Sequence, residues 1–376
     1  MDDYPREFQV FFKPAGPACN LACKYCYYTE KSRLYHGKMM QMPDDLLEIY
    51  IRQHIEASNG PVITFSWHGG EPMLAGINFY RKALSLQRKY NHANKPVING
   101  LQTNGTMITT EWCEFLAAEK FVVGLSLDGP EDLHNMYRKT KDGKGTFRQV
   151  MKGFDRLAMH GIDPEILAVV HAQNAHHPGK VYSFLKHLGI GFITFIPLVE
   201  RLQNIPHKVS VRSVPADAFG LFLCRIFDEW VREDIGKIKV QIFEEAIRTA
   251  FNQEHTVCIF RPVCGSVPVI EHNGNFYSCD HFVDRGHLLG NIRDMHLVEL
   301  LESQEQRKFG HAKIDLLPEY CRMCEVKAMC NGECPKNRFL STNGGEGGLN
   351  YLCAGYKMFF NHCRPFANAV AAMYET

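Results

Sequence analysis

The feature that most limits the fold of this chain is a regular alternation of short apolar runs with longer amphipathic segments. Runs of β-branched and aromatic residues predict strands at 9–13, 62–67, 100–102, 122–127, 166–170 and 192–196. Apolar residues at helical spacing predict helices at 44–58, 79–90, 111–119, 147–160, 180–187 and 216–232. Six strand-then-helix units in succession predict an α/β fold with a parallel sheet, either open or curled into a barrel.

The residues that follow the predicted strands favour the barrel. Three cysteines follow the first strand, and Gly69-Gly70-Glu71 follows the second. Residues 102–105 (QTNG) end the third strand, and residues 126–129 (SLDG) end the fourth. Functional groups at the carboxyl ends of successive strands are typical of a barrel active site. Six units are fewer than the eight of a closed TIM barrel, so we expect a partial, TIM-like barrel.

The composition excludes several classes of function. The 376 residues carry 42 basic and 41 acidic side chains, a net charge of +1. This balance gives no electrostatic reason to expect nucleic acid as a partner. No apolar stretch is long enough to cross a bilayer, and residues 1–10 lack the pattern of a signal peptide. We therefore expect a cytoplasmic protein whose 14 cysteines serve metal or redox chemistry rather than disulfides.

Cys19, Cys23 and Cys26 stand in the spacing Cys-x3-Cys-x2-Cys. Closely spaced thiolates select soft metals, and an iron–sulfur cluster is the usual occupant of such a loop. A cubane cluster takes four ligands, so three cysteines leave one iron open to bind another molecule. Two other interpretations are a disulfide with a spare thiol, and a zinc site with a distant fourth ligand.

The texture of the sequence changes near residue 240, and we predict one domain over 1–240 and a turn-rich, cysteine-rich domain over 241–376. Nine of the 14 cysteines lie between Cys258 and Cys363. Eight of them form the series Cys258, Cys264, Cys279, Cys321, Cys324, Cys330, Cys334 and Cys353. From spacing alone, two four-cysteine zinc sites are an alternative to iron–sulfur clusters. The three remaining cysteines, Cys113, Cys224 and Cys363, are expected to pack as small apolar residues. Residues 344–348 (GGEGG) are expected to form a flexible loop.

Motifs along nearly the whole chain resemble one family. They are CNLACKYCYY (19–28), WHGGEP (67–72), LQTNGT (101–106), VGLSLDGP (123–130), YSCDHF (277–282), LGNI (289–292), CNGECPKNRF (330–339) and GLNYLCAGY (348–356). Together they resemble the anaerobic sulfatase-maturating enzymes, which are radical S-adenosylmethionine (SAM) enzymes with a C-terminal SPASM domain. The resemblance implies a partial (β/α)6 barrel, bound SAM and three [4Fe–4S] clusters.

The resemblance also implies ligands and contacts. Cys19, Cys23 and Cys26 would hold the cluster that binds SAM. The family pattern interleaves the others: Cys258, Cys264, Cys279 and Cys334 in one set, and Cys321, Cys324, Cys330 and Cys353 in the other. The implied SAM contacts are Tyr25, Gly69, Gly70, Glu71, Ser126, Arg138 and Val199. Glycine would let the backbone approach SAM, and Glu71 would accept from its ammonium. The alternative role for Arg138 is a surface salt bridge instead of a SAM contact. His68 stands where some relatives have Gln.

The implied reaction converts a cysteine or serine of a sulfatase polypeptide to Cα-formylglycine. A deoxyadenosyl radical removes hydrogen from Cβ, a base takes the side-chain proton, and an electron leaves through an auxiliary cluster. Asp280 matches the family's proton acceptor, and an anionic cluster beside it is expected to raise its pKa; a turn cap is the alternative. Tyr28 is expected to face the same cavity and position the substrate.

The implied partners are an unfolded sulfatase segment with the motif Cys/Ser-x-Pro-x-Arg, and an electron donor such as flavodoxin or ferredoxin. One alternative keeps the fold and changes the reaction: SPASM enzymes that form thioether or other crosslinks in ribosomal peptides. Those often carry an N-terminal leader-binding domain, for which a first strand at residue 9 leaves no room. A second alternative is a zinc-bound scaffold for peptides, which the three-ligand loop disfavours.

Overall fold

The computed structural model describes residues 8–35, 41–202, 205 and 207–374. The chain forms two compact units, each assembled from separate stretches of sequence. The first contains residues 1–126, 138–164 and 265–310, and the second contains residues 127–137, 165–264 and 311–376. These two units are divided differently from the predicted domains 1–240 and 241–376, and the predicted division stays a prediction.

The first unit is built on a sheet with the strand order β10-β9-β8-β1-β2-β3-β4. Four parallel strands are β1 (Phe11–Lys13), β2 (Ile63–Trp67), β3 (Val97–Thr103) and β4 (Val122–Ser126). β8 (Val269–Glu271) adds to β1 in parallel, with Lys13 opposite Glu271. β9 (Asn275–Tyr277) and β10 (Leu288–Asn291) continue the sheet in antiparallel fashion. A strand from the cysteine-rich half thus extends the sheet beside β1, from which the Cys19 loop departs.

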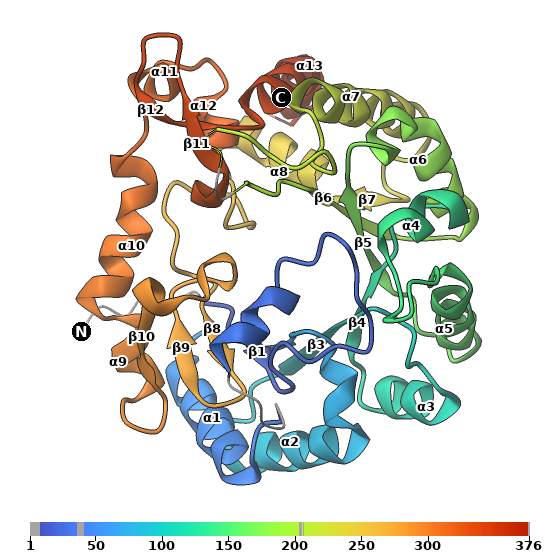
Figure 1. Cartoon of the computed structure of the whole chain (residues 1–376), viewed down its shortest axis with the longest axis vertical. Coiled ribbons are helices and arrows are strands. Elements are labelled where there is room, and N and C mark those ends of the chain that lie inside the picture. The colour runs from blue at the N-terminus through green and yellow to red at the C-terminus, as the bar shows by residue number, and fades with distance from the viewer. Residues whose placement is uncertain (1–7, 36–40, 203–204, 206, 375–376) are drawn as a thin grey trace. The chain divides into compact units, whose positions relative to one another are not determined.

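Helices cover this sheet, and the Cys19 loop lies on the other side of the strands (Figure 1). The helices of the unit are α1 (Asp44–Ala57), α2 (Ile77–Tyr90), α3 (Thr110–Ala118), α5 (Phe147–Met159) and α9 (Leu297–Leu301), with short 3-10 turns at η1 (Thr29–Leu34), η2 (Pro72–Ala75), η4 (Asp280–Phe282) and η5 (Arg285–His287). Aromatic side chains fill the layer between helices and sheet; the rings of Phe12 and Tyr50 stack at 3.7 Å, and Trp67 packs edge-on against Tyr80. This buried layer fixes the ends of β1 and β2, where the loops of the site begin.

The second unit contains the parallel strands β5 (Glu165–Val170), β6 (Phe192–Pro197) and β7 (Lys239–Val240). Its helices are α4 (Glu131–Tyr137), α6 (Pro178–His187), α7 (Ala216–Glu233), α8 (Gln241–Ala250), α11 (Glu319–Arg322), α12 (Lys327–Cys330) and α13 (Cys353–Ala372), with η3 (Asn174–His176) and η6 (Pro335–Asn337). A hairpin of β11 (Arg338–Ser341) and β12 (Gly347–Asn350) precedes α13, which packs along α7 (Figure 1). One further helix, α10 (Gln304–Asp315), contributes residues to both units.

All six predicted strands and all six predicted helices are present, with ends shifted by at most three residues. The glycine-rich stretch 344–348 lies in the turn that closes the β11–β12 hairpin, with a 2.8 Å bond from Thr342 N to Glu346 O, and its expected flexibility stays a prediction. The cysteine-rich half also holds more helix than its turn-rich sequence indicates, above all the 20 residues of α13. Within the described residues, every helix is too short or too polar to cross a membrane.

Candidate active site

The Cys19 loop is held against the loop that follows β2. Gly70 N donates to Gly16 O and Glu71 N donates to Ala18 O, each at 2.9 Å. A Cβ atom at Gly70 would lie 2.1 Å from Ala18 O. Glycine is therefore required at residue 70 for contact between two loops, in addition to any approach of a ligand.

Two further segments hold the same loop. The Asn20 amide donates to Thr106 Oγ1 at 2.8 Å and accepts from the Asn104 amide at 2.9 Å. Ala22 N donates to Lys139 O at 2.8 Å. The loops after β2, β3 and α4 therefore fix the backbone on which the three cysteines stand.

The three cysteines fit an iron–sulfur cluster. All three are half-buried, and Cys23 and Cys26 lie close enough to Cys19 to influence its titration. Burial raises the pKa of the Cys19 thiol to about 12, although the amide of Leu21 donates to its sulfur at 3.4 Å. A bound metal displaces such thiol protons, and closely grouped thiolates suit iron.

Three of the residues predicted to contact SAM differ in their surroundings. Arg138 is 6% exposed and lies over the Tyr25 ring, 5.6 Å from guanidinium carbon to ring centroid, so it is not a surface salt bridge. Ser126 Oγ accepts from the Gln102 amide at 3.2 Å at the end of β4. Val199 follows β6 in the second unit and is half-buried. Its contact with adenine stays a prediction.

Glu71 is already satisfied by the chain itself. Its carboxylate is fully buried and accepts from Asn104 N and Thr103 Oγ1, both at 2.8 Å, and from Met73 N at 3.1 Å. Burial outweighs these donors and raises the pKa of Glu71 to about 7. The carboxylate therefore ties the loop after β2 to the end of β3, next to the glycine pair.

Asp280 forms an ion pair that the sequence did not predict. Lys13, the last residue of β1, is fully buried, and its Nζ lies 2.6 Å from Asp280 Oδ1. The same Nζ lies 3.3 Å from His68 Nδ1 and 4.4 Å from the centroid of the Tyr28 ring. Asp280 is 6% exposed and begins η4, directly after Cys279. A lysine inside an otherwise apolar strand could have been noticed in the sequence, because lysine is almost never fully buried without a partner.

The pKa of Asp280 is set by burial and by neighbouring charges with opposite effects, and the expected rise caused by an anionic cluster stays a prediction. Burial is the largest single influence and disfavours the carboxylate, but Lys13, His68 and His281 together outweigh it, so the pKa of Asp280 lies below its usual value. The charges of the chain itself therefore do not raise the pKa of Asp280. Desolvation, with Lys13 acting in the same direction, lowers the pKa of His68 to about 3 and keeps that ring neutral.

The two tyrosines after Cys26 reach different acids. Tyr28 is buried, and its hydroxyl donates to Glu271 at the end of β8. Tyr27 is the more exposed of the two, and its hydroxyl donates to Asp280. The predicted role of Tyr28 in positioning the substrate stays a prediction, and Tyr27 is the tyrosine that donates to Asp280. Adjacent tyrosines cannot be distinguished by type, and only the direction of each side chain separates them.

The second C-terminal cysteine set lines one pocket. Cys321, Cys324, Cys330 and Cys353 share this pocket with Tyr320, Lys327, Asn350 and Lys357. Four thiols around a single cavity match the requirement of a cubane cluster with four protein ligands. Burial raises the pKa of Cys330 to about 12 and of Cys353 to about 11, and metal binding would release these protons.

Three members of the other set gather around a buried lysine. Lys313 is 1% exposed, and its Nζ donates to the carbonyls of Cys258 at 2.9 Å and Ile259 at 2.8 Å. Thiolates at Cys258, Cys264 and Cys334 would each act on the Lys313 charge, so all three lie near it. Cys279 belongs to the first unit, and its membership of this set stays a prediction.

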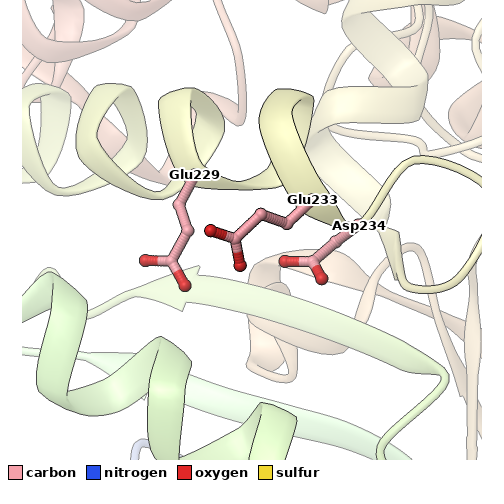
Figure 2. Close-up of side chains that lie close together, drawn as sticks. All are labelled: Glu229, Glu233 and Asp234. Carbon is pink, nitrogen blue, oxygen red and sulfur yellow. The ribbon is translucent and has the colours of Figure 1, made fainter.

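A group of acids at the end of α7 also has ligand-like spacing. The carboxylates of Glu229, Glu233 and Asp234 point to the same side of the helix (Figure 2), with ligand atoms within 4.8 Å of one another. The Lys186 ammonium lies 3.0 Å from Glu229, 2.9 Å from Glu233 and 2.9 Å from Asp234. One lysine therefore contacts all three acids, and these ion pairs join α6 to α7.

Comparisons with known proteins agree with the fold and with the class of cofactor. Residues 14–185 match the Radical SAM superfamily, and residues 258–325 match SPASM, an iron–sulfur cluster-binding domain. The chain is thus a radical SAM enzyme of the α/β class, a partial barrel with a C-terminal SPASM domain, and its cofactors are SAM and iron–sulfur clusters.

Similar proteins narrow the class to one family. A serine-type anaerobic sulfatase-maturating enzyme of Bacteroides thetaiotaomicron is 43% identical, over 96% of this chain and 91% of that protein. A cysteine-type enzyme of Clostridium perfringens is 34% identical, over 95% and 96%. The solved structure of native anSMEcpe with bound AdoMet and Cp18Cys peptide has a TM-score of 0.88 and 33% identity, over 97% and 99%. The chain belongs to the anaerobic sulfatase-maturating enzymes.

Proposed function

We propose that this enzyme oxidises a cysteine or serine side chain of a sulfatase polypeptide to Cα-formylglycine, with Asp280 as the proton acceptor. The observation that carries this proposal is the buried ion pair of Asp280 with Lys13, to which Tyr27 adds a hydrogen bond, one residue after Cys279 and at the end of the Cys19 loop. An ionisable pair buried at the end of barrel strands is costly, and such pairs are found where chemistry requires them.

The chain's own residues divide the work around the reacting side chain. When bound, SAM and the clusters supply a deoxyadenosyl radical that removes hydrogen from the substrate Cβ, and an acceptor for the remaining electron. Asp280 accepts the thiol or hydroxyl proton of the substrate at a carboxylate oxygen. Lys13 keeps this carboxylate ionised and fixed, because its ammonium is buried with Asp280 and has no access to water. The Tyr27 hydroxyl donates to Asp280 Oδ2, the other oxygen of the carboxylate, and so helps to fix the orientation of Asp280.

Cofactor binding is assigned to the residues that surround the Cys19 loop. Cys19, Cys23 and Cys26 hold the SAM-binding cluster, and Arg138 beside Tyr25 receives the SAM carboxylate. Ser126 is assigned to the same SAM site, and Val199, which belongs to the second unit, stays a predicted contact of the adenine. Because the Glu71 carboxylate is occupied by three donors of the chain, we assign the SAM ammonium to the backbone carbonyls of the Gly69-Gly70 segment. Tyr28 donates to Glu271, and its ring centroid lies 4.4 Å from Lys13 Nζ, from where it positions the substrate beside Asp280.

Two auxiliary clusters complete the cofactor set of three. Cys321, Cys324, Cys330 and Cys353 hold one, which their common pocket supports. Cys258, Cys264, Cys279 and Cys334 hold the other, which the grouping of three of them around Lys313 supports. The substrate is an unfolded segment with Cys/Ser-x-Pro-x-Arg, because the target atom must reach a buried radical. A flavodoxin- or ferredoxin-type protein supplies electrons.

The test is Asp280→Asn in anaerobically reconstituted enzyme, with SAM, a reductant and a synthetic peptide carrying Cys-x-Pro-x-Arg. We expect formylglycine to fall by at least about 100-fold, because a general base contributes roughly that factor, while deoxyadenosine is still released. Mass spectrometry of the peptide and chromatography of the nucleoside measure the two products.

Asp284→Asn is the matched control. Asp284 lies four residues away, and its carboxylate caps η5 through Gly286 N at 2.9 Å without contacting Lys13. We expect this variant to retain peptide oxidation. Full formylglycine yield with Asp280→Asn would contradict the assignment of the base.

A further inference from the structure

The loop between Cys330 and Cys334 has an unusual backbone. Asn331, Gly332 and Glu333 follow one another with φ angles of +45°, +70° and +52°. Glycine adopts this left-handed region readily, but two of the three residues carry side chains, for which it is unfavourable. Cys330 belongs to one proposed cluster set and Cys334 to the other, so this strained turn joins two metal sites. Contacts from outside the loop must hold it in place.

Asn337 and Asn350 donate to the Glu333 carboxylate, and one further side chain contacts the backbone of the whole turn. Arg338 begins β11, and its guanidinium donates to the carbonyls of all three loop residues: Gly332 at 2.8 Å, Asn331 at 2.7 Å and Glu333 at 3.1 Å. A Cβ atom on Gly332 would lie 2.5 Å from Arg338 Nη2, so the guanidinium rests directly on the turn. The planar fork of arginine can serve several acceptors at once, which a lysine ammonium on a flexible stem cannot reproduce in one plane.

The same guanidinium is also linked by hydrogen bonds to the cysteine set that contains Cys334. Its Nη1 donates to Lys313 O at 2.5 Å, and Lys313 Nζ in turn donates to the carbonyls of Cys258 and Ile259. The thiolates of Cys264, from one set, and of Cys321 and Cys330, from the other, would each act on the charge of Arg338. Arg338 is thus connected to both cysteine sets within the second unit.

We propose that Arg338 is the positioning residue shared by the two auxiliary clusters: it holds the Asn331–Glu333 turn and places one fixed positive charge between the two sites. The inference rests on the proposed assignment of the two cluster sets. A cluster becomes more negative when it gains an electron, so a cation held nearby favours the reduced state. Arg338 therefore sets the geometry of Cys330 and Cys334 and raises the reduction potential of both auxiliary clusters.

The test uses the full chain, reconstituted anaerobically with iron and sulfide. Arg338→Gln removes the charge and keeps one donor group, and Arg338→Lys keeps the charge but loses the fork. We expect Arg338→Gln to move the midpoint potentials of both auxiliary clusters to more negative values in an EPR-monitored redox titration. We expect Arg338→Lys to shift them less while lowering the iron content per chain. The cluster whose EPR signal changes on addition of SAM should be unaffected in both variants.

Arg322→Met is the matched control. Arg322 is next to Cys321 and also donates to two carbonyls, Leu317 at 2.9 Å and Asp315 at 3.0 Å, but it is exposed. Water screens an exposed charge, so the potentials should change less than with Arg338→Gln. Unchanged potentials in Arg338→Gln, or a change confined to one auxiliary cluster, would overturn the shared role.

A second variant covers the case in which Arg338→Gln does not fold. Gly332→Ala keeps the arginine but introduces a methyl group 2.5 Å from its Nη2 and 2.4 Å from Leu317 Cδ2. We expect both auxiliary EPR signals to change, and wild-type signals would contradict the proposal. If the wild-type chain itself carries iron for fewer than three clusters, the proposed cofactor assignment fails, which is distinguishable from failure of the Arg338 inference alone.

Discussion

At the scale of single residues, Gly70 controls the position of the Cys19 loop. Its substitution by alanine would place a methyl group 2.1 Å from Ala18 O, on backbone that cannot rotate away. We expect Gly70→Ala to lower the iron bound at the N-terminal site and to weaken SAM binding by about tenfold or more, because overpacking displaces the loop. Iron analysis and equilibrium dialysis with SAM measure the effect.

Gly60→Ala is the control for this substitution. Gly60 precedes β2, and a Cβ atom there has no neighbour within 4 Å. We expect wild-type iron content and SAM affinity. Normal SAM binding by Gly70→Ala would show that the two loops move apart at little cost.

His54 gives the first unit a pH-dependent stability. Burial lowers the pKa of His54 in α1 to about 3, while its Nε2 lies 3.0 Å from Thr64 O. The unfolded chain, in which the pKa is about 6.5, binds one more proton between these two pH values. The free energy of unfolding should therefore fall as pH decreases below about 6.5, by up to ~1.4 kcal/mol per pH unit from this residue. Urea unfolding at several pH values tests this, and His54→Gln should show a smaller slope than wild type.

At the scale of elements, the packing of α13 on α7 depends on two glycines. A Cβ atom at Gly355 would lie 2.0 Å from Ala216 O, and one at Gly220 would lie 2.8 Å from Gly355 Cα. The backbones therefore touch where the helices meet. We expect Gly355→Ala to lower the free energy of unfolding by ~1–3 kcal/mol, measured by denaturant titration, because the helices cannot separate without losing contacts elsewhere.

Gly179→Ala is a control with the opposite sign. Gly179 lies in the first turn of α6, and a Cβ atom there has open space around it. Alanine is the better helix former, by about 0.5–1 kcal/mol in a helix interior, so the variant should be equal to wild type or slightly more stable. A loss of stability as large as that of Gly355→Ala would show that any added methyl group is harmful in this unit.

At the scale of the whole molecule, metal should stabilise the second unit more than the helices of the first. Cys321, Cys324, Cys330 and Cys353 lie on separate segments that a cluster would join. Because metal binding to such sites is coupled to folding, removal of iron should increase hydrogen exchange over 321–353 by at least about tenfold. Exchange over α1 (Asp44–Ala57) should stay unchanged. Equal exchange with and without iron would contradict a structural role for the cluster.

The architecture was largely predictable because it follows local patterns. Strand and helix periodicities placed all twelve predicted elements, and the cysteine spacing indicated the cofactor class. The β8 strand was missed because three residues give no periodic signal, and its pairing with β1 joins segments more than 250 positions apart. α13 was missed because its apolar residues surround much of the helix and Pro365 interrupts the pattern.

The sequence by itself determined the chemistry that the chain can carry: thiolates at fixed spacing, a glycine pair followed by an acid, and an aspartate beside a cysteine. Tertiary structure alone decided which groups meet. Lys13 and Asp280 are 267 positions apart and form an ion pair only because β8 adds to β1 and brings η4 to its end. Likewise, Tyr27 rather than Tyr28 donates to Asp280. Arg338 donates to the backbone carbonyls of a turn that lies between the two C-terminal cysteine sets. Residue type and spacing are local properties, whereas the direction of a side chain and its partner depend on how distant segments pack.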